Sequence, residues 1–414
     1  MTAVTDLVSR SGDLKQELLK FAQRPRFAKA LRTALRRVGD DPAEGEGTVI
    51  NALDFFILQH RLADGLTVVD HFVAARPDLP ERERQMLLDW RDVVEGLFEV
   101  QRRDGEALLL VNLIDELIYR VHSNVGTAVF AQMPRRSFVI TRLVPVGPEW
   151  LLSGSQSILP SSARHEVARV AAQLASERPA LVFRNPEKLR RGWELQRQDR
   201  ARFIEFFGAD LVVLPGPQLA ERMQAYWRHC IHQITADPSY PAKAGAWAGV
   251  SPAAPDLDLP PGLAGSKTVG VIYDEVEGLN FYADFGQVAE AFANPEIVTK
   301  QPAYRRKVQS YLRDDSVSPL PLRRLAEQDP AKASRLFQLV LKRPTFSWQA
   351  DGEALLRRRK RAFFDKPALP SVTPISGIIS EHYRAAASDR APQKTARASR
   401  RLARGKLLSK TRPG

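Results

Sequence analysis

Four carboxylates near a predicted hairpin are the residues of this sequence that best suit metal-dependent chemistry. They are Asp274, Glu275, Glu277 and Asp284. Carboxylate oxygens hold hard divalent cations, and such cations activate water in nucleases and phosphatases. The acids gather around the turn Glu277-Gly278, where solvent-exposed turn residues would give the same pattern. A metal-dependent enzyme using this hairpin is therefore one hypothesis, and a plain turn is the other.

A second group of candidate metal ligands lies in one predicted helix. His229 and His232 are three residues apart on one helix face and flank Cys230. Zinc needs three or four ligands, and no further ligand follows at a fixed spacing. Since Cys230 is the only cysteine, an internal disulfide, a multi-cysteine zinc site and an iron-sulfur cluster are excluded. We interpret the trio as two surface or half-buried histidines beside a core cysteine, and we expect no cofactor.

Motifs for phosphate binding and for nucleophilic catalysis are missing from the sequence. Neither Gly-x-x-x-x-Gly-Lys-Ser/Thr nor Gly-x-Gly-x-x-Gly occurs, and the glycines between Gly262 and Lys267 stand in the wrong order for a P-loop. The serines at 153, 155, 161 and 162 lack the Gly-x-Ser-x-Gly context of a nucleophile. The sequence leaves enzymatic activity uncertain and leans against it.

Basic residues concentrate at the two ends of the chain, whose formal net charge is +13. Residues 384–414 hold ten Lys or Arg against Asp389 alone, a net charge of +9, and residues 1–38 add +6, which leaves −2 for everything between. Flexible basic segments bind phosphate backbones by releasing counterions. We therefore predict that the tail contacts nucleic acid or the ribosome. The residues expected to make this contact are Arg397, Arg400, Arg401, Arg404, Lys406 and Lys410.

Other interpretations of the basic segments remain open. A basic tail also suits an acidic protein partner, an acidic membrane surface or solubility alone. The run Arg357-Arg358-Arg359-Lys360-Arg361 adds five charges just before the tail, but cations also stabilise a helix C-terminus. Abundant arginine and alanine can further reflect a GC-rich genome rather than a ligand.

The elements that must position these residues follow from hydrophobic periodicity. Apolar residues recur at helical spacing through the first hundred residues, and Pro80 with Glu81 and Glu83 marks one helix start. From Leu97 the period changes towards two. Five strands are predicted there, at 97–102, 107–113, 117–122, 138–146 and 150–159.

Five short strands in so few residues favour a small barrel of SH3-like or OB-like type. Such barrels bind single-stranded nucleic acid on aromatic residues in a basic groove. Phe98, Tyr119, Phe138 and Trp150 could serve, but residues 97–160 hold six arginines and six acids. In a neutral barrel we expect these aromatics to be core or docking residues.

The predicted fold class is α+β, predominantly helical: a helical bundle and a small five-stranded SH3/OB-like β-barrel, then a second mainly helical domain with a β-hairpin. The stretch 235–265 is rich in Pro, Gly and Ala, and we interpret it as a linker. The predicted parts are a helical module at 1–96, a β-barrel-like module at 97–160, a helical module at 161–234 packing on the first two, the linker at 235–265, the helical domain with its hairpin at 266–365, and a disordered basic tail at 366–414.

One stretch of the chain resembles a known type of protein. The segments Phe55-Phe56-Ile57, Leu97-Phe98-Glu99-Val100, Arg142 to Gly147 and Leu151 to Gly154 resemble uncharacterised bacterial proteins that often carry a SEC-C motif, a short Cys-rich zinc-binding segment. The resemblance covers roughly residues 50–160. Because this chain has no cysteine pair, the zinc-binding role is not transferred to any position.

The opening residues lack the apolar region of a secretory signal, and no run reaches the roughly 18 apolar residues of a membrane span. We therefore expect a soluble, cytoplasmic, multi-domain bacterial protein. The hypothesis favoured by the sequence is a non-enzymatic binding or scaffold protein whose basic tail contacts nucleic acid.

Overall fold

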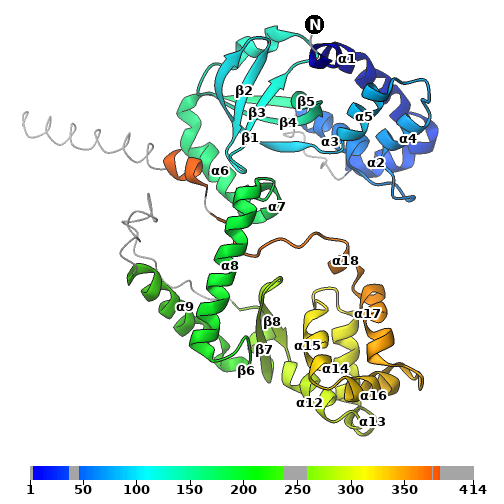
Figure 1. The fold of residues 1–414 in the computed structure, drawn as a ribbon, viewed down its shortest axis with the longest axis vertical. Coiled ribbons are helices and arrows are strands. Elements are labelled where there is room, and N and C mark those ends of the chain that lie inside the picture. Colours follow the sequence, from blue (N-terminus) through cyan, green and yellow to red (C-terminus); the bar gives the residue numbers. More distant parts are fainter. Residues whose placement is uncertain (1–2, 37–45, 237–258, 375, 383–414) are drawn as a thin grey trace, which may run out of the picture. The chain divides into compact units, whose positions relative to one another are not determined.

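The chain forms two compact units in the computed structural model, which describes residues 3–36, 46–236, 259–374 and 376–382 (Figure 1). Unit 1 takes the chain up to Asn185 and again after Pro374, and unit 2 is the continuous segment Pro186–Pro374. Both helices and strands are present, so the predicted mixed α+β class is confirmed.

Five strands of unit 1 pair in a ring. They are β1 (Val94–Asp104), β2 (Ala107–Asn112), β3 (Ile118–His122), β4 (Phe138–Val146) and β5 (Glu149–Leu159). Their order is β1-β2-β3-β5-β4, and β4 pairs with β1 to close the ring. Only the β3–β5 pair is parallel. All five strands lie where the period of two predicted them.

Alternation along the strands directs apolar side chains into the ring. Phe98, Leu110, Val121 and Leu143 are buried together there. The register of the β4–β5 pair shifts between Ile140 and Arg142, which marks a bulge. Next to this bulge, the Arg142 side chain contacts Asp54, which lies in one of the helices of unit 1.

The helical elements of unit 1 are α1 (Ala3–Ala22), the 3-10 turn η1 (Pro25–Phe27), α2 (Ala28–Arg36), α3 (Glu46–Leu58), α4 (Val68–Ala74) and α5 (Glu81–Asp89), followed after the strands by α6 (Arg164–Glu177) and α7 (Pro179–Val182). Helices α1 to α5 pack together on one side of the ring, and α6 lies against β1 away from them (Figure 1). Leu14, Leu18 and Phe56 form a shared core with Val144 and Leu151 of the ring. Helix α5 begins at the predicted start and ends at Asp89, and Val94 already pairs in β1.

Unit 2 is built on a three-stranded antiparallel sheet, in the order β6-β7-β8, flanked by helices. Its elements are α8 (Pro186–Phe207), β6 (Leu211–Pro215), α9 (Leu219–Ala236), α11 (Pro261–Ala264), β7 (Thr268–Asp274), β8 (Gly278–Ala283), α12 (Phe285–Ala293), α13 (Ile297–Lys300), α14 (Pro302–Arg313), α15 (Leu320–Gln328), α16 (Pro330–Leu341), α17 (Trp348–Arg359) and α18 (Arg361–Phe364). The predicted hairpin is present as β7 and β8. The one-turn helix α11 falls in the described end of the predicted linker.

The division into units corrects the predicted domain boundaries. Helices α8 and α9 were expected to pack on the first two modules, but Phe203 and Met223 share a core with Val269 and Tyr273 of the hairpin strands. The cause is β6, which pairs with β7 over its whole length although the predicted linker separates the two in sequence. The boundaries of the compact units therefore fall at 185/186 and 374/375.

The sequence predicts a disordered tail from residue 366 onward, and the structure differs from this prediction up to residue 382. Residues 366–374 and 376–382 are ordered parts of the two units, and Ile379 is buried in unit 1. Ser376 Oγ donates to the Leu113 carbonyl (3.1 Å) and to Glu116 Oε1 (2.6 Å). Within the described ranges, no helix is long and apolar enough to cross a membrane.

Candidate functional site

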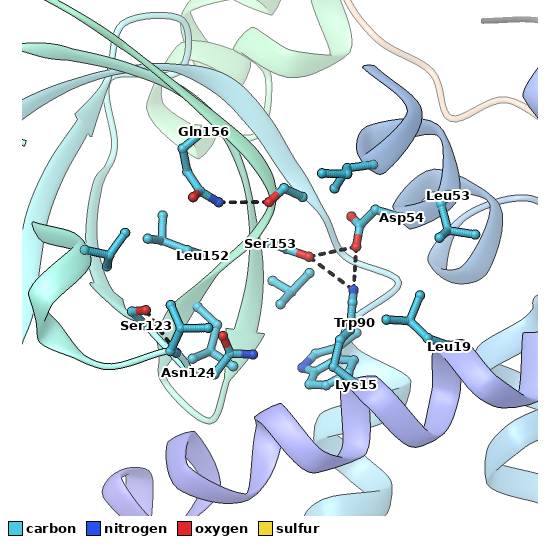
Figure 2. Close-up of a pocket in the computed structure, with 16 residues that line it drawn as sticks. Lys15, Leu19, Leu53, Asp54, Trp90, Ser123, Asn124, Leu152, Ser153 and Gln156 are labelled. Carbon is cyan, nitrogen blue, oxygen red and sulfur yellow. Dashed lines mark hydrogen bonds and ion pairs between the residues drawn. The ribbon is translucent and has the colours of Figure 1, made fainter. Parts of the chain in front are cut away.

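A cavity of about 380 Å³ lies in unit 1 where helices α1 and α3 meet strand β5 (Figure 2). Most of its wall is apolar, with Leu19, Leu53, Leu152 and the Trp90 ring among the residues that form it. The volume lies in the range of small-molecule sites, which are mostly apolar with a few convergent polar groups. The polar side chains of the cavity are Lys15, Asp54 and Ser153 at one wall and Ser123, Asn124 and Gln156 elsewhere.

Three side chains from three elements converge at one wall of the cavity (Figure 2). Lys15 Nζ forms an ion pair with Asp54 and donates to Ser153 Oγ (3.2 Å). Ser153 Oγ in turn donates to Asp54 Oδ1 (2.8 Å). The ammonium group also lies 5.4 Å from the centre of the Trp90 ring, a distance at which a cation is attracted by an aromatic face.

Arg142 of β4 completes the network from the other side of Asp54. Its Nε donates to Asp54 Oδ2 (2.8 Å), and its Nη2 donates to Gln59 Oε1 (2.6 Å). The side chains of Arg142 and Asp54 are only 4% and 3% exposed. Burial alone would raise the pKa of Asp54, but the positive charges of Lys15 and Arg142 and their hydrogen bonds outweigh burial, so this pKa lies below its usual value.

Two cations of this network, Lys15 and Arg142, contact the same buried carboxylate, that of Asp54. The other acid near Arg142 is Glu95, 3.3 Å away, whose side chain is 55% exposed and therefore screened by water. An ammonium group has three N–H donors. Lys15 donates two of its N–H groups to Asp54 and Ser153, and no side chain or carbonyl in the described ranges accepts the third.

Local structure explains why these groups meet. Lys15 follows the buried Leu14 on α1 and is itself 20% exposed, so its stem leaves the core and its ammonium group reaches the cavity. Gly154 has a φ of +66°, which favours glycine because a Cβ is strained there. A Cβ at this position would also lie 2.3 Å from Asn51 Oδ1. The glycine thus allows β5 to bend close to α3 and presents Ser153 to Asp54.

This geometry suits binding rather than nucleophilic catalysis. Lys15 Nζ donates to Asp54 and to Ser153, so it is placed as a hydrogen-bond donor and not as a general base. The Ser153 hydroxyl hydrogen is directed at a carboxylate whose lowered pKa makes it a weak base. What the site offers is a positive charge at the wall of an apolar cavity.

The four carboxylates predicted as a metal site do not form one group. Asp274 Oδ1 accepts from the backbone N–H groups of Val276 and Glu277 and so stabilises the turn. Glu275 is 74% exposed and lies 3.4 Å from Arg200. Asp284 lies at the opposite end of β8 from the turn and forms an ion pair with Lys307 (2.7 Å). Burial raises the pKa of Glu277.

The histidine pair on α9 is likewise unaccompanied by further ligands. His229 lies 3.8 Å from Glu205, and its ring packs near Phe206. Burial raises the pKa of the Cys230 thiol, as expected of an unreactive cysteine. Over all residues that the structure describes, no three His, Cys, Asp or Glu side chains are grouped so that they could hold a metal ion.

The predicted nucleic-acid contacts Arg397, Arg400, Arg401, Arg404, Lys406 and Lys410 lie outside the described residues. The basic run before them is described and is not a continuous charged surface. Lys360 is buried, with Nζ donating to the Asp314 carbonyl, while Arg357 pairs with Glu353 (3.0 Å) and covers the Phe364 ring. Burial lowers the pKa of Lys360.

The aromatic residues of the ring serve as core, as we expected. Phe98, Tyr119 and Phe138 are buried, and the partly buried Trp150 ring meets the Tyr119 ring edge-on at 5.1 Å. The Tyr119 hydroxyl donates to Asp115 Oδ2 (2.6 Å), a buried carboxylate. None of these rings lines the cavity around Lys15.

Sequence reasoning missed the residues of this cavity, although a weak signal exists. Asp54 is the only charged residue of α3 after Glu46, and Arg142 is the only one of β4. A single charge inside an apolar helix or strand has to be paired when it is buried. The pattern indicates that a partner exists but does not identify it.

Comparisons with known proteins add no functional information. The resemblance of residues 50–160 to SEC-C-associated bacterial proteins therefore stays a prediction. No protein family, curated protein or solved structure was found to match this chain.

Proposed function

We propose that this protein is a non-enzymatic binding protein that holds a small organic anion with an apolar body in the Lys15 cavity. The observation that carries the proposal is the Lys15 ammonium group at a mostly apolar wall, with one N–H that no group of the described residues accepts. An anionic head would accept this third N–H of Lys15. The apolar body would lie against Leu19, Leu53 and Trp90.

The type of the barrel belongs to the same proposal. The ring order β1-β2-β3-β5-β4, with its one parallel pair, requires that the connection from β3 to β4 passes over β5. Greek-key barrels of five strands are the OB type, which serves in binding rather than in one particular chemistry. We therefore favour OB-like over SH3-like for this module.

The alternative of a metal-dependent enzyme has less support. It would need the carboxylates of residues 274–284 around one ion, whereas Asp284 is held by Lys307 at the far end of β8 and Asp274 is occupied by the turn. A second candidate function, contact with nucleic acid through the basic tail, rests on the net charge of +9 over residues 384–414.

Thermal unfolding in the presence of octanoate tests the cavity. A ligand that binds only the folded state raises the melting temperature by mass action. We expect octanoate to raise it for the natural protein, and 1-octanol, which has no charge, to raise it less. The substitution Lys15→Met should remove the effect of octanoate, because it removes the cation while keeping a long apolar side chain.

Lys20→Met is the matched control, since Lys20 is an exposed lysine of the same helix. It should leave the response to octanoate unchanged. Calorimetric titration at a temperature where each variant is folded separates lost binding from lost stability. An equal response to octanol and octanoate, or an octanoate response that survives in Lys15→Met, would contradict the proposal.

A further inference from the structure

The cavity around Lys15 opens to water past two apolar side chains. Ile50 of α3 and Val125, which lies in the turn after β3, both line the cavity. They are nevertheless 43% and 79% exposed. We call this pair the apolar rim, because it stands where the cavity meets solvent.

The opposite end of the cavity is buried. Trp90, Val144 and Leu151 line it and are at most 3% exposed, and Ser153, which contacts the Lys15 ammonium group, is buried as well. A ligand whose anionic head contacts this ammonium group therefore has its head among buried residues. Any part of the ligand that is too long for the interior leaves the cavity past the rim.

Three further polar side chains line the cavity and carry no charge. Ser123 Oγ accepts from the Val125 N–H (3.2 Å), and Gln156 Nε2 donates to the Gly154 carbonyl (2.8 Å). Both hydrogen bonds stabilise the local backbone. Asn124 is half-buried, so water can reach its amide. These groups therefore do not favour a second charge on the ligand.

Charge is confined to one wall of the cavity, and apolar surface continues from the interior to the rim. Lys15 and Asp54 are the only charged side chains among the described residues that line the cavity (Figure 2). Ile50 precedes Leu53 by three residues, so the two lie on one face of α3. Covering such apolar surface stabilises a complex by about 25 cal/mol for each Å² removed from water.

We propose that the ligand of this cavity is a long-chain fatty acid, with its carboxylate at Lys15 and its chain leaving between Ile50 and Val125. This inference rests on the proposed anion site and adds the length and the hydrocarbon character of the apolar body. A hydrocarbon chain has no polar group to satisfy, which suits a rim of two aliphatic side chains. A short organic acid would fill the interior and leave the rim in water.

Calorimetric titration of the full chain with hexanoate, octanoate, decanoate and dodecanoate tests the length, each acid being kept below the concentration at which it forms micelles. We expect affinity to rise beyond octanoate, by at most about fourfold for each CH₂ group that becomes buried. The test variant, Ile50→Ser with Val125→Ser, removes the apolar rim. It should weaken dodecanoate binding on the order of tenfold more than hexanoate binding, since contact equivalent to about two CH₂ groups is lost.

Ile118→Ser with Val276→Ser is the matched control, because it removes the same two residue types at positions that are 69% and 50% exposed and do not line the cavity. It should bind every acid as the natural protein does. Each variant is titrated at a temperature at which circular dichroism shows it to be folded.

The outcomes separate this inference from the proposed function. If octanoate binding depends on Lys15 but affinity does not rise beyond octanoate, the anion site stands and the long-chain ligand is overturned. The long-chain ligand is also overturned if the rim variant weakens the binding of all four acids equally, because the rim then only shapes the cavity. If none of the acids binds, the anion site and the inference fail together.

Discussion

Asp54 is the residue on which the charge balance of the Lys15 cavity depends. It is the one buried carboxylate between two cations and also accepts from Ser153. Removing one partner of a buried charge network costs about 3–5 kcal/mol, because the remaining charges stay buried without compensation. We expect Asp54→Asn to lower the free energy of unfolding by about that amount, measured by urea unfolding.

The same residue gives a pH dependence whose sign follows from its lowered pKa. The pKa of Asp54 is lower in the folded protein than in the unfolded chain, where an aspartate has a pKa of about 3.9. The stability contributed by Asp54 is thus fully present above that pH and is lost as the pH falls through the folded-state pKa. The natural protein should lose stability below about pH 4 more steeply than Asp54→Asn does. If Asp54→Asn loses stability at acidic pH as steeply as the natural protein does, Asp54 contributes nothing to this pH dependence.

At the scale of elements, Gly154 controls how closely β5 approaches α3. An alanine there would meet both the strained φ of +66° and the side chain of Asn51. Strained positions of this kind cost about 1–3 kcal/mol. We expect Gly154→Ala to destabilise the protein by that order and to weaken octanoate binding, because Ser153 would be displaced.

Gly105 provides the matched control for this substitution. Its φ of +63° is nearly the same, but a Cβ there would meet no atom within 4 Å. Gly105→Ala should therefore show the backbone strain alone and leave octanoate binding intact. Equal effects of the two substitutions on stability and binding, measured side by side, would mean that the contact with α3 does not matter.

Elements with strong periodicity could be predicted from the sequence. The strands β1 to β5 and the hairpin of β7 and β8 follow from alternation. These patterns are local, so each is complete within one stretch of the chain. The class and the order of elements follow from them.

Pairings between distant stretches could not be predicted in the same way. Strand β6 is a short apolar run whose partner β7 begins more than fifty residues later, and nothing within the run identifies that partner. The anchoring of residues 376–382 depends on one buried isoleucine and a few hydrogen bonds in a segment of disorder-like composition. The Lys15 cavity was missed for the same reason, since its polar residues come from α1, α3, β4 and β5.

At the scale of the whole molecule, unit 2 is an insertion within unit 1. The chain leaves unit 1 at Asn185, whose Nδ2 donates to the Asp115 carbonyl (2.8 Å), and re-enters it at Ser376, which donates to Glu116. Both crossing points are thus held by neighbouring residues of one turn. A short linker could span them without disturbing the ring.

We expect unit 1 to fold when residues 186–374 are replaced by a short Gly/Ser linker, and residues 186–374 to fold alone, since each unit has its own hydrophobic core. Circular dichroism should show a cooperative thermal transition for each fragment. As a control, unit 1 without residues 375–382 should be less stable, because it loses the contacts of Ile379. Non-cooperative melting of either fragment would contradict the division into independent units.

The sequence distances bridged around Asp54 have a consequence for folding kinetics. Its partners Lys15, Arg142 and Ser153 are 39, 88 and 99 positions away along the chain. Contacts between such distant positions require long loops to close, and they form late on the folding pathway. Interactions that form after the rate-limiting step slow unfolding and leave the folding rate almost unchanged. The network should therefore slow the unfolding of the helices from the ring of strands while leaving the rate at which they first pack almost unchanged.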